Sequence, residues 1–182
     1  FIQHGMAARI RVLDGTQDTY ADEAGISALL DHASLSIGRF YYETEGFRPN
    51  NDYQRRISNA FLQISPSQSL NLQVELRNSD FERGDLVLRF DPSNFRPERA
   101  KVKNSIDRLS ARYGFGVGND VVLSFIHNDS LVDFEFPGLI TILEHTDNSL
   151  AEAQSIVRFG PIGATLGGGY VRGHNNVNFG GF

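Results

Sequence analysis

The sequence predicts an all-β fold, and its hydropathy pattern and its spacing of turns both support this prediction. In residues 70–77, Leu-Asn-Leu-Gln-Val-Glu-Leu-Arg, every even position is apolar and every odd position is polar or charged. Because successive side chains of a β-strand point to opposite faces, this segment has one apolar and one polar face. Several other segments repeat the alternation, with short turns and longer polar links between them. This layout is typical of an antiparallel transmembrane β-barrel with a polar interior.

Composition and charge exclude several kinds of site. The 182 residues include no cysteine, so the chain offers no disulfide framework and no zinc–thiolate site. The net charge of −5 argues against a general nucleic-acid-binding protein. No apolar run reaches the roughly 18 residues of a transmembrane helix, whereas a barrel strand needs only about 9–11 residues. The chain begins at Phe1 without a leader sequence, which indicates a mature or trimmed segment.

Five strands are expected in the first half of the chain. In the first, apolar residues alternate with Arg9 and Arg11, which share a face. A polar, acidic loop at residues 14–23 separates this strand from the second. The fifth is the alternating run described above. The five strands are expected at residues 6–12, 26–30, 34–43, 57–64 and 70–78.

The expected strand at residues 34–43 has no single apolar face. Leu35 and Ile37 favour one face, whereas Phe40 and Tyr42 favour the other. A β-bulge or a change of environment along the strand would reconcile the two halves.

Four more strands are expected in the second half, at residues 106–117, 121–127, 151–159 and 162–172. Tight turns are expected near residues 32, 66, 119 and 161. Long loops are expected near residues 79–104 and 128–150, and the last ten residues show no clear period. We therefore expect one β-barrel region over residues 1–182.

A soluble β-sandwich is the alternative fold, because its strands would show the same alternation with the apolar face turned inward. Two observations favour the barrel. The long links are confined to alternate connections, as in outer-membrane barrels. Small residues also stand beside arginines on the polar faces, as in Arg108-x-Ser110-x-Arg112-x-Gly114, which suits a curved, crowded lumen.

Several segments carry a more specific pattern. Residues 41–52 read Tyr-Tyr-Glu-Thr-Glu-Gly-Phe-Arg-Pro-Asn-Asn-Asp, residues 83–86 read Arg-Gly-Asp-Leu, and residues 90–95 read Phe-Asp-Pro-Ser-Asn-Phe. With the run at 70–77 and Leu-Ser-Ala-Arg-Tyr at 109–113, they resemble a family of bacterial outer-membrane β-barrel proteins. In that family the barrel follows periplasmic tetratricopeptide or FecR-like segments. The resemblance covers roughly residues 40–170 and implies an outer-membrane pore or anchor.

Three features depart from a complete protein of that kind. The sequence contains no helical repeat segment. The terminal Phe182 lacks the alternating apolar residues of the outer-membrane assembly signal. The nine expected strands are an odd number, whereas closed bacterial barrels have an even number. These departures predict an incomplete barrel segment.

Eight side chains are candidates for lining a polar lumen, where they would set a pore's electrostatics or hold an anionic solute. The structural alternative is an arginine–glutamate network that props the lumen open. In a soluble sandwich the same residues would lie on the surface. The candidates are Arg9, Arg11, Gln73, Glu75, Arg77, Arg108, Arg112 and Arg172.

No sequence motif indicates catalysis, a cofactor or a metal site. The acidic segment with Asp14, Asp18, Asp22 and Glu23 does not match the spacing of a calcium loop, so a solvated loop is favoured. The histidines are scattered, and no nucleophile elbow or phosphate-binding glycine loop is present.

The sequence therefore predicts a non-enzymatic β-barrel in the outer membrane of a Gram-negative bacterium. It would act as a passive pore or export channel for polar solutes, or as a membrane anchor for periplasmic domains. Its expected partners are outer-membrane lipid and other envelope proteins, and not nucleic acid. The alternatives are a secreted β-sandwich that binds carbohydrate or protein, and a subunit of a multi-protein outer-membrane assembly.

Overall fold

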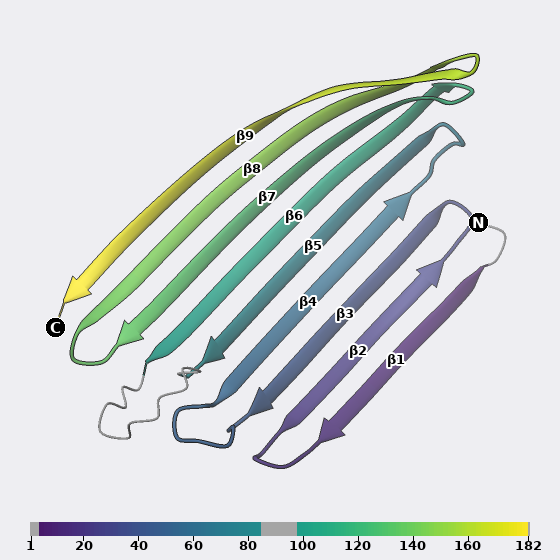
Figure 1. Ribbon diagram of the computed structural model, residues 1–182. Helices are drawn as coiled ribbons and strands as arrows, with labels where there is room; N and C mark the ends of the chain where they lie inside the picture. Colours follow the sequence, from purple (N-terminus) through teal and green to yellow (C-terminus); the bar gives the residue numbers. More distant parts are fainter. Residues whose placement is uncertain (1–3, 85–97, 182) are drawn as a thin grey trace.

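The computed structural model of the chain describes residues 4–84 and 98–181, and all strands in these ranges belong to one antiparallel sheet. The strands pair in chain order, from β1 at one edge to β9 at the other (Figure 1). They are β1 (Gly5–Asp14), β2 (Tyr20–Leu29), β3 (Ala33–Thr44), β4 (Tyr53–Ile64), β5 (Leu70–Arg83), β6 (Arg99–Gly116), β7 (Asn119–Phe136), β8 (Ile140–Phe159) and β9 (Ile162–Gly181).

The connections define two ends of the sheet. At one end, which we call the basal end, lie the links at residues 30–32, 65–69, 117–118 and 160–161. The links at 15–19, 45–52 and 137–139 lie at the distal end, and so do Gly84 and Glu98, which follow β5 and precede β6. Gly118 and Gly138 have φ of 74° and 72° in their hairpin turns, a conformation that favours glycine. The four tight turns are confirmed at the predicted places, all at the basal end.

The nine predicted strands are confirmed, but several are longer than expected. The predicted long loop at 128–150 is wrong, because β7 and β8 continue through it to a tight turn at 137–139. Runs such as Asn128-Asp129-Ser130 conceal the strand period there because both faces are polar. The last residues, expected to be irregular, form the distal half of β9. Of the loop expected at 79–104, the two ends are strand, and residues 85–97 lie outside the described residues.

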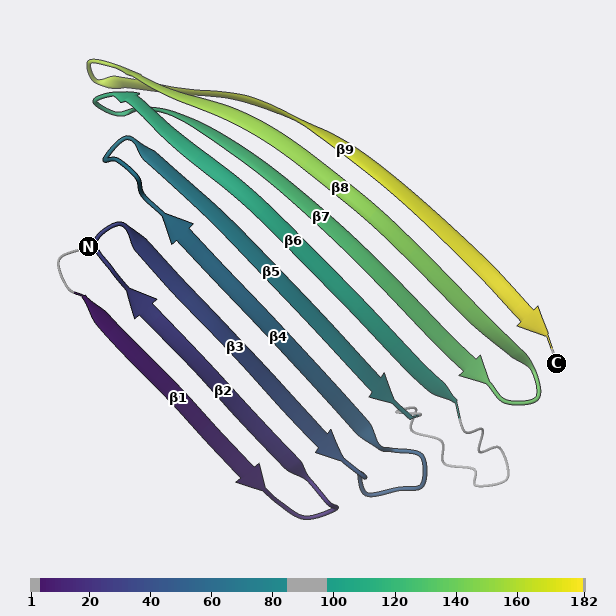
Figure 2. The same cartoon turned by 180° about the vertical axis from the view of Figure 1, so that it is seen from behind.

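The sheet is strongly curved, as the long arcs of β6 to β9 show in Figures 1 and 2. Along β5, side-chain exposure alternates between the two faces of the curved sheet. On β5, Leu72, Val74 and Leu76 are exposed, whereas Asn71 and Gln73 are half-buried. We call the more exposed face the convex face and the other the concave face.

The third strand is regular, so the predicted bulge is absent and a change of environment remains. No register shift occurs where β3 pairs with β2 and β4. Leu35 and Ile37 lie on the convex face, and Phe40 and Tyr42 lie on the concave face. In a regular strand, odd and even positions point to opposite faces, so no bulge is needed to separate the two pairs.

The described residues form a single open layer. They lie in one sheet and not in two packed sheets, so they do not make the alternative β-sandwich. Ala100, 7% exposed, and Gly84 are the only buried residues among them. In the described parts of the chain the outer edges of β1 and β9 pair with no strand. No helix there is long and apolar enough to cross a membrane.

Candidate functional site: two faces that exchange polarity

The convex face carries an apolar belt in the basal half of the sheet. Residues opposite one another in an antiparallel pair share a face, so the registers give the rows of this face directly. One row runs from Leu35 on β3 through Leu62 and Val74 to Leu109, Phe125, Ala151 and Tyr170 on β9. Most large side chains of the belt are exposed, among them Met6, Ile10, Ile26, Ile37, Leu62, Leu72, Val74, Leu109, Leu123, Phe125, Leu166 and Tyr170.

The distal half of the same convex face is polar and charged. Arg39 pairs with Asp22 at 2.9 Å, and His145 Nε2 lies 2.7 Å from Asp129 Oδ2. His127 Nδ1 lies 3.1 Å from the hydroxyl of Ser149. The boundary between belt and polar half follows a row that contains Leu76, Asp107 and His127.

Seven of the eight predicted lining residues share the concave face, and Arg11 lies nearer the distal end than the others. Glu75 lies opposite Arg108 and Gln73 opposite Ser110, and parity places the remaining members on the same side. Arg172 is the exception, and its predicted place among the lumen-lining residues is wrong. It lies opposite Ser149 on the convex face, at an even position of β9 with Tyr170 and Leu166. The seven are Arg9, Arg11, Gln73, Glu75, Arg77, Arg108 and Arg112.

Most of the seven are held by neighbours across the strands. Arg108 Nη1 donates to Glu75 Oε2 at 2.6 Å, and Arg112 forms a two-bond contact with Asp120 at 3.0 Å for each bond. Gln73 donates to Gln63 Oε1 at 3.3 Å. This arrangement is an arginine–carboxylate network of the kind that the sequence offered as the structural alternative.

Glu23 completes the network at the β1 edge, and sequence reasoning missed it. It lies 3.9 Å from Arg9 and 3.7 Å from Arg11, because the β1–β2 register places it directly opposite Arg11. Asp22, its neighbour, faces the other way and pairs with Arg39. The acidic loop expected at 14–23 is therefore shorter: residues 15–19, with Asp18, form the link, whereas Asp22 and Glu23 lie on opposite faces of β2.

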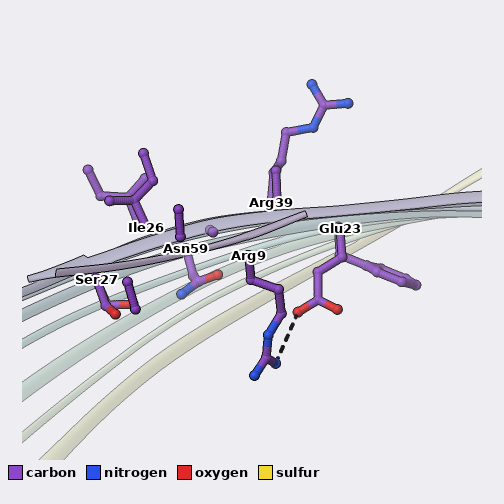
Figure 3. Close-up of a pocket in the computed structure, with 14 residues that line it drawn as sticks. Arg9, Glu23, Ile26, Ser27, Arg39 and Asn59 are labelled. Atoms are coloured by element: carbon purple, nitrogen blue, oxygen red, sulfur yellow. Dashed lines mark ion pairs between the residues drawn. The ribbon is translucent and has the colours of Figure 1, made fainter. Parts of the chain in front are cut away.

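A shallow hollow lies on the concave face beside Arg9. Gly25 and Gly38 lie side by side on β2 and β3, so no side chain fills the space between Arg9 and Asn59. A Cβ on Gly38 would approach Asn59 Oδ1 to 3.0 Å. Figure 3 shows Arg9, Glu23, Ser27 and Asn59 on this side of the sheet and Ile26 and Arg39 on the other.

Arg77, on the row of Arg9 and Asn59, is a free cation of the concave face. It lies opposite Asn59, and no ion pair joins it to any residue in the described ranges. The basal concave face thus presents two arginines on either side of small and amide side chains. Such a surface can hydrogen-bond a polar or anionic solute.

Toward the distal end of β3, β4 and β5 the concave face carries aromatic side chains. Tyr42 and Tyr53 have ring centroids 5.8 Å apart, and Tyr53 stacks on Phe81 at 6.3 Å. The same registers place Arg55 and Arg83 among these rings. We call Tyr42, Tyr53, Arg55, Phe81 and Arg83 the arginine–aromatic cluster.

A cluster of hydrogen bonds and ion pairs at the distal end, which we call the Arg99 cluster, joins the link 45–52 to Gly84 and to the distal ends of β5 and β6. Arg99 Nη2 lies 2.6 Å from Asp52 Oδ2 and 2.8 Å from Glu82 Oε1, and Gly84 N donates to Asp52 O at 3.0 Å. The hydrogen bond to Asp52, and then that to Glu82, raises the pKa of the Arg99 guanidinium above its ordinary value, although burial opposes this. The Arg99 cluster thus brings together residues of two segments that carried the family resemblance, those at 41–52 and 83–86.

Comparison of the chain with family models, curated proteins and solved structures found no match. In the described ranges, no three His, Asp or Glu side chains are grouped so that they could hold a metal ion.

Proposed function

We propose that this sheet is part of the wall of a β-barrel in a Gram-negative outer membrane, with its convex belt against lipid. The exchange of polarity between the two faces carries this proposal. In the basal half the outside is apolar and the inside polar, as in a membrane barrel with a wet lumen. Toward the distal end the outside is polar, and beyond a row of polar side chains the inside is mainly apolar and aromatic, as in a protein part surrounded by water.

The height of the belt supports the membrane assignment. On β9 the belt runs from Ile162 to Tyr170, which corresponds to about 27 Å along the strand. A tilt of about 40° reduces this to about 21 Å along the membrane normal, close to the roughly 25 Å apolar band of outer-membrane barrels. The distal halves of β7, β8 and β9 would then extend beyond the membrane.

Strand direction supports a wall that needs further strands. Both β1 and β9 run from the basal to the distal end (Figure 1). These two edges can pair only in parallel, so an all-antiparallel closure needs an odd number of additional strands. The odd number of strands, with both edges running in the same direction, also favours the second candidate. This is a subunit whose edges pair with strands of another envelope protein.

The proposed activity is passive. The network of Arg108 with Glu75 and of Arg112 with Asp120 would line a lumen that filters polar solutes by size and charge. If the lumen is filled, the same wall would serve as a membrane anchor for periplasmic domains. Single-channel conductance of the natural full-length protein distinguishes these two roles.

The absence of cysteine permits a direct test. We would place single cysteines at Val74 in the belt, at Ser105 on the distal convex face, and at Ser110 on the basal concave face. With the full-length protein in vesicles, we expect a water-soluble maleimide to label S105C and to leave V74C unlabelled, while a lipid-phase probe labels V74C.

Heat modifiability on SDS gels of the same preparations reports a closed barrel. Labelling of V74C as fast as S105C, in a protein extracted without detergent, would contradict the membrane assignment. Labelling of S110C tests whether the lumen contains water, and its absence would favour the anchor over the pore.

A further inference from the structure

We propose that the arginine–aromatic cluster on the distal concave face binds an organic carboxylate with an apolar body. The cluster combines aromatic rings with two cationic groups that have no partner among the described residues. The inference rests on the geometry of one face and does not depend on whether the belt meets lipid.

The first observation is the alternation of charge and ring on two neighbouring strands. Arg55 lies opposite Phe81, and Arg83 lies opposite Tyr53, so guanidinium and aromatic side chains alternate across β4 and β5. Tyr42 lies opposite Arg55 on the other side and extends the ring surface to β3. All five side chains are half-buried, so the cluster remains open to a ligand.

The second observation is that both arginines lack a partner in the part of the chain that the structure describes. Within the described ranges, neither Arg55 nor Arg83 has an ion pair, and Arg55 Nε is buried without any hydrogen-bond partner. A buried donor without a partner is costly, and a guanidinium in an apolar setting gains more from an anion than one in water.

The third observation concerns two carboxylates that adjoin the cluster in the sequence. Asp52 precedes Tyr53 and Glu82 precedes Arg83, but both bind Arg99 at the distal end. Their engagement leaves the two cluster arginines available for an external anion.

The chemistry of the ligand follows from these surroundings. The planar fork of arginine matches the two oxygens of a carboxylate. The rings of Tyr42, Tyr53 and Phe81, with Ala100 and Phe134 in the row beside Arg83, would cover an apolar body. A small, strongly hydrated anion would gain little from these rings, so the site favours an amphiphilic carboxylate.

The test uses 2-naphthoate and its uncharged amide, 2-naphthamide, as probes in ligand-observed NMR. The full chain is studied in lipid nanodiscs, or in plain buffer if it proves soluble, with empty nanodiscs as the blank. We expect binding of naphthoate and at least tenfold weaker binding of the amide, because loss of charge-assisted hydrogen bonds costs about that factor or more.

Three arginine variants locate the site. R55Q and R83Q should each weaken naphthoate binding about tenfold or more. R56Q is the matched control, because Arg56 is adjacent in the sequence but lies on the convex face. R77Q controls for general attraction by the concave face. Circular dichroism and the urea midpoint establish that each variant is folded.

Equal binding of naphthoate and its amide would overturn the proposal, as would a folded R55Q and a folded R83Q that both bind like the parent protein. An equal loss in R77Q would assign the effect to the whole concave face and also overturn it. The membrane assignment is tested separately by the cysteine variants.

Discussion

Replacing Val74 with arginine tests where the apolar belt meets lipid. Val74 lies opposite Leu62 and Leu109 on the convex face. It is four residues from Asn78, the first polar residue of β5 on that face, which is about 13 Å along the strand and about 10 Å along the membrane normal. This depth is close to the middle of the belt, where an arginine on the lipid face costs about 2–4 kcal/mol.

The assay is urea unfolding of protein folded in phospholipid vesicles, followed by the mobility of unboiled samples on gels. N78R is the matched control, because Asn78 lies on the same strand and face at the margin of the belt, where the cost is about 0–1 kcal/mol. Equal losses of unfolding free energy in V74R and N78R would refute the reasoning, since a uniformly hydrated convex face has no depth dependence.

Two further predictions concern the distal end. Gly84→Ala should lower the unfolding free energy, because a Cβ there would lie 2.0 Å from the backbone oxygen of Asn50, whereas Gly163→Ala, with nothing within 4 Å, should be tolerated in the same urea titration. The hydrogen bond from Tyr41 to Glu43 at 2.5 Å, followed by burial, raises the pKa of Tyr41 above 10.0. The folded state therefore holds the Tyr41 proton more tightly, and this stabilisation is full below pH 10 and lost as the pH rises through the folded pKa. Spectroscopic titration should show a lower pKa of Tyr41 after Glu43→Gln, and an unchanged curve would contradict the assigned cause.

The number of strands and the alternation of their side chains could be predicted from the sequence. Leu72, Val74 and Leu76 alternate with Gln73, Glu75 and Arg77, and a local period of two is sufficient to place them on opposite faces. The tight basal turns were also local features, since three of them interrupt the period with glycine, proline or serine and the fourth does so with Asp31.

The distal halves of β7 and β8 could not be found in this way. Their residues 128–136 and 140–149 contain polar side chains on both faces, and the apolar ones change from the convex to the concave face. A method that follows one continuous apolar face stops where that face ends. The pairing of each strand with its neighbours continues the sheet nevertheless, because backbone hydrogen bonds do not depend on side-chain polarity.

The sequence by itself determined that the chain forms alternating strands, which side chains of each strand share a face, and where the four basal turns fall, because these are properties of neighbouring residues. Only the tertiary structure decided which side chains of neighbouring strands lie opposite one another. In the structure, Glu23 lies beside Arg9 and Arg11, and Arg172 lies on the convex face. Arg55 and Arg83 lie among the same aromatic rings. These relations depend on the register between neighbouring strands of the sheet. A shift of one residue in the register of a pair would turn the side chains of one strand to the other face.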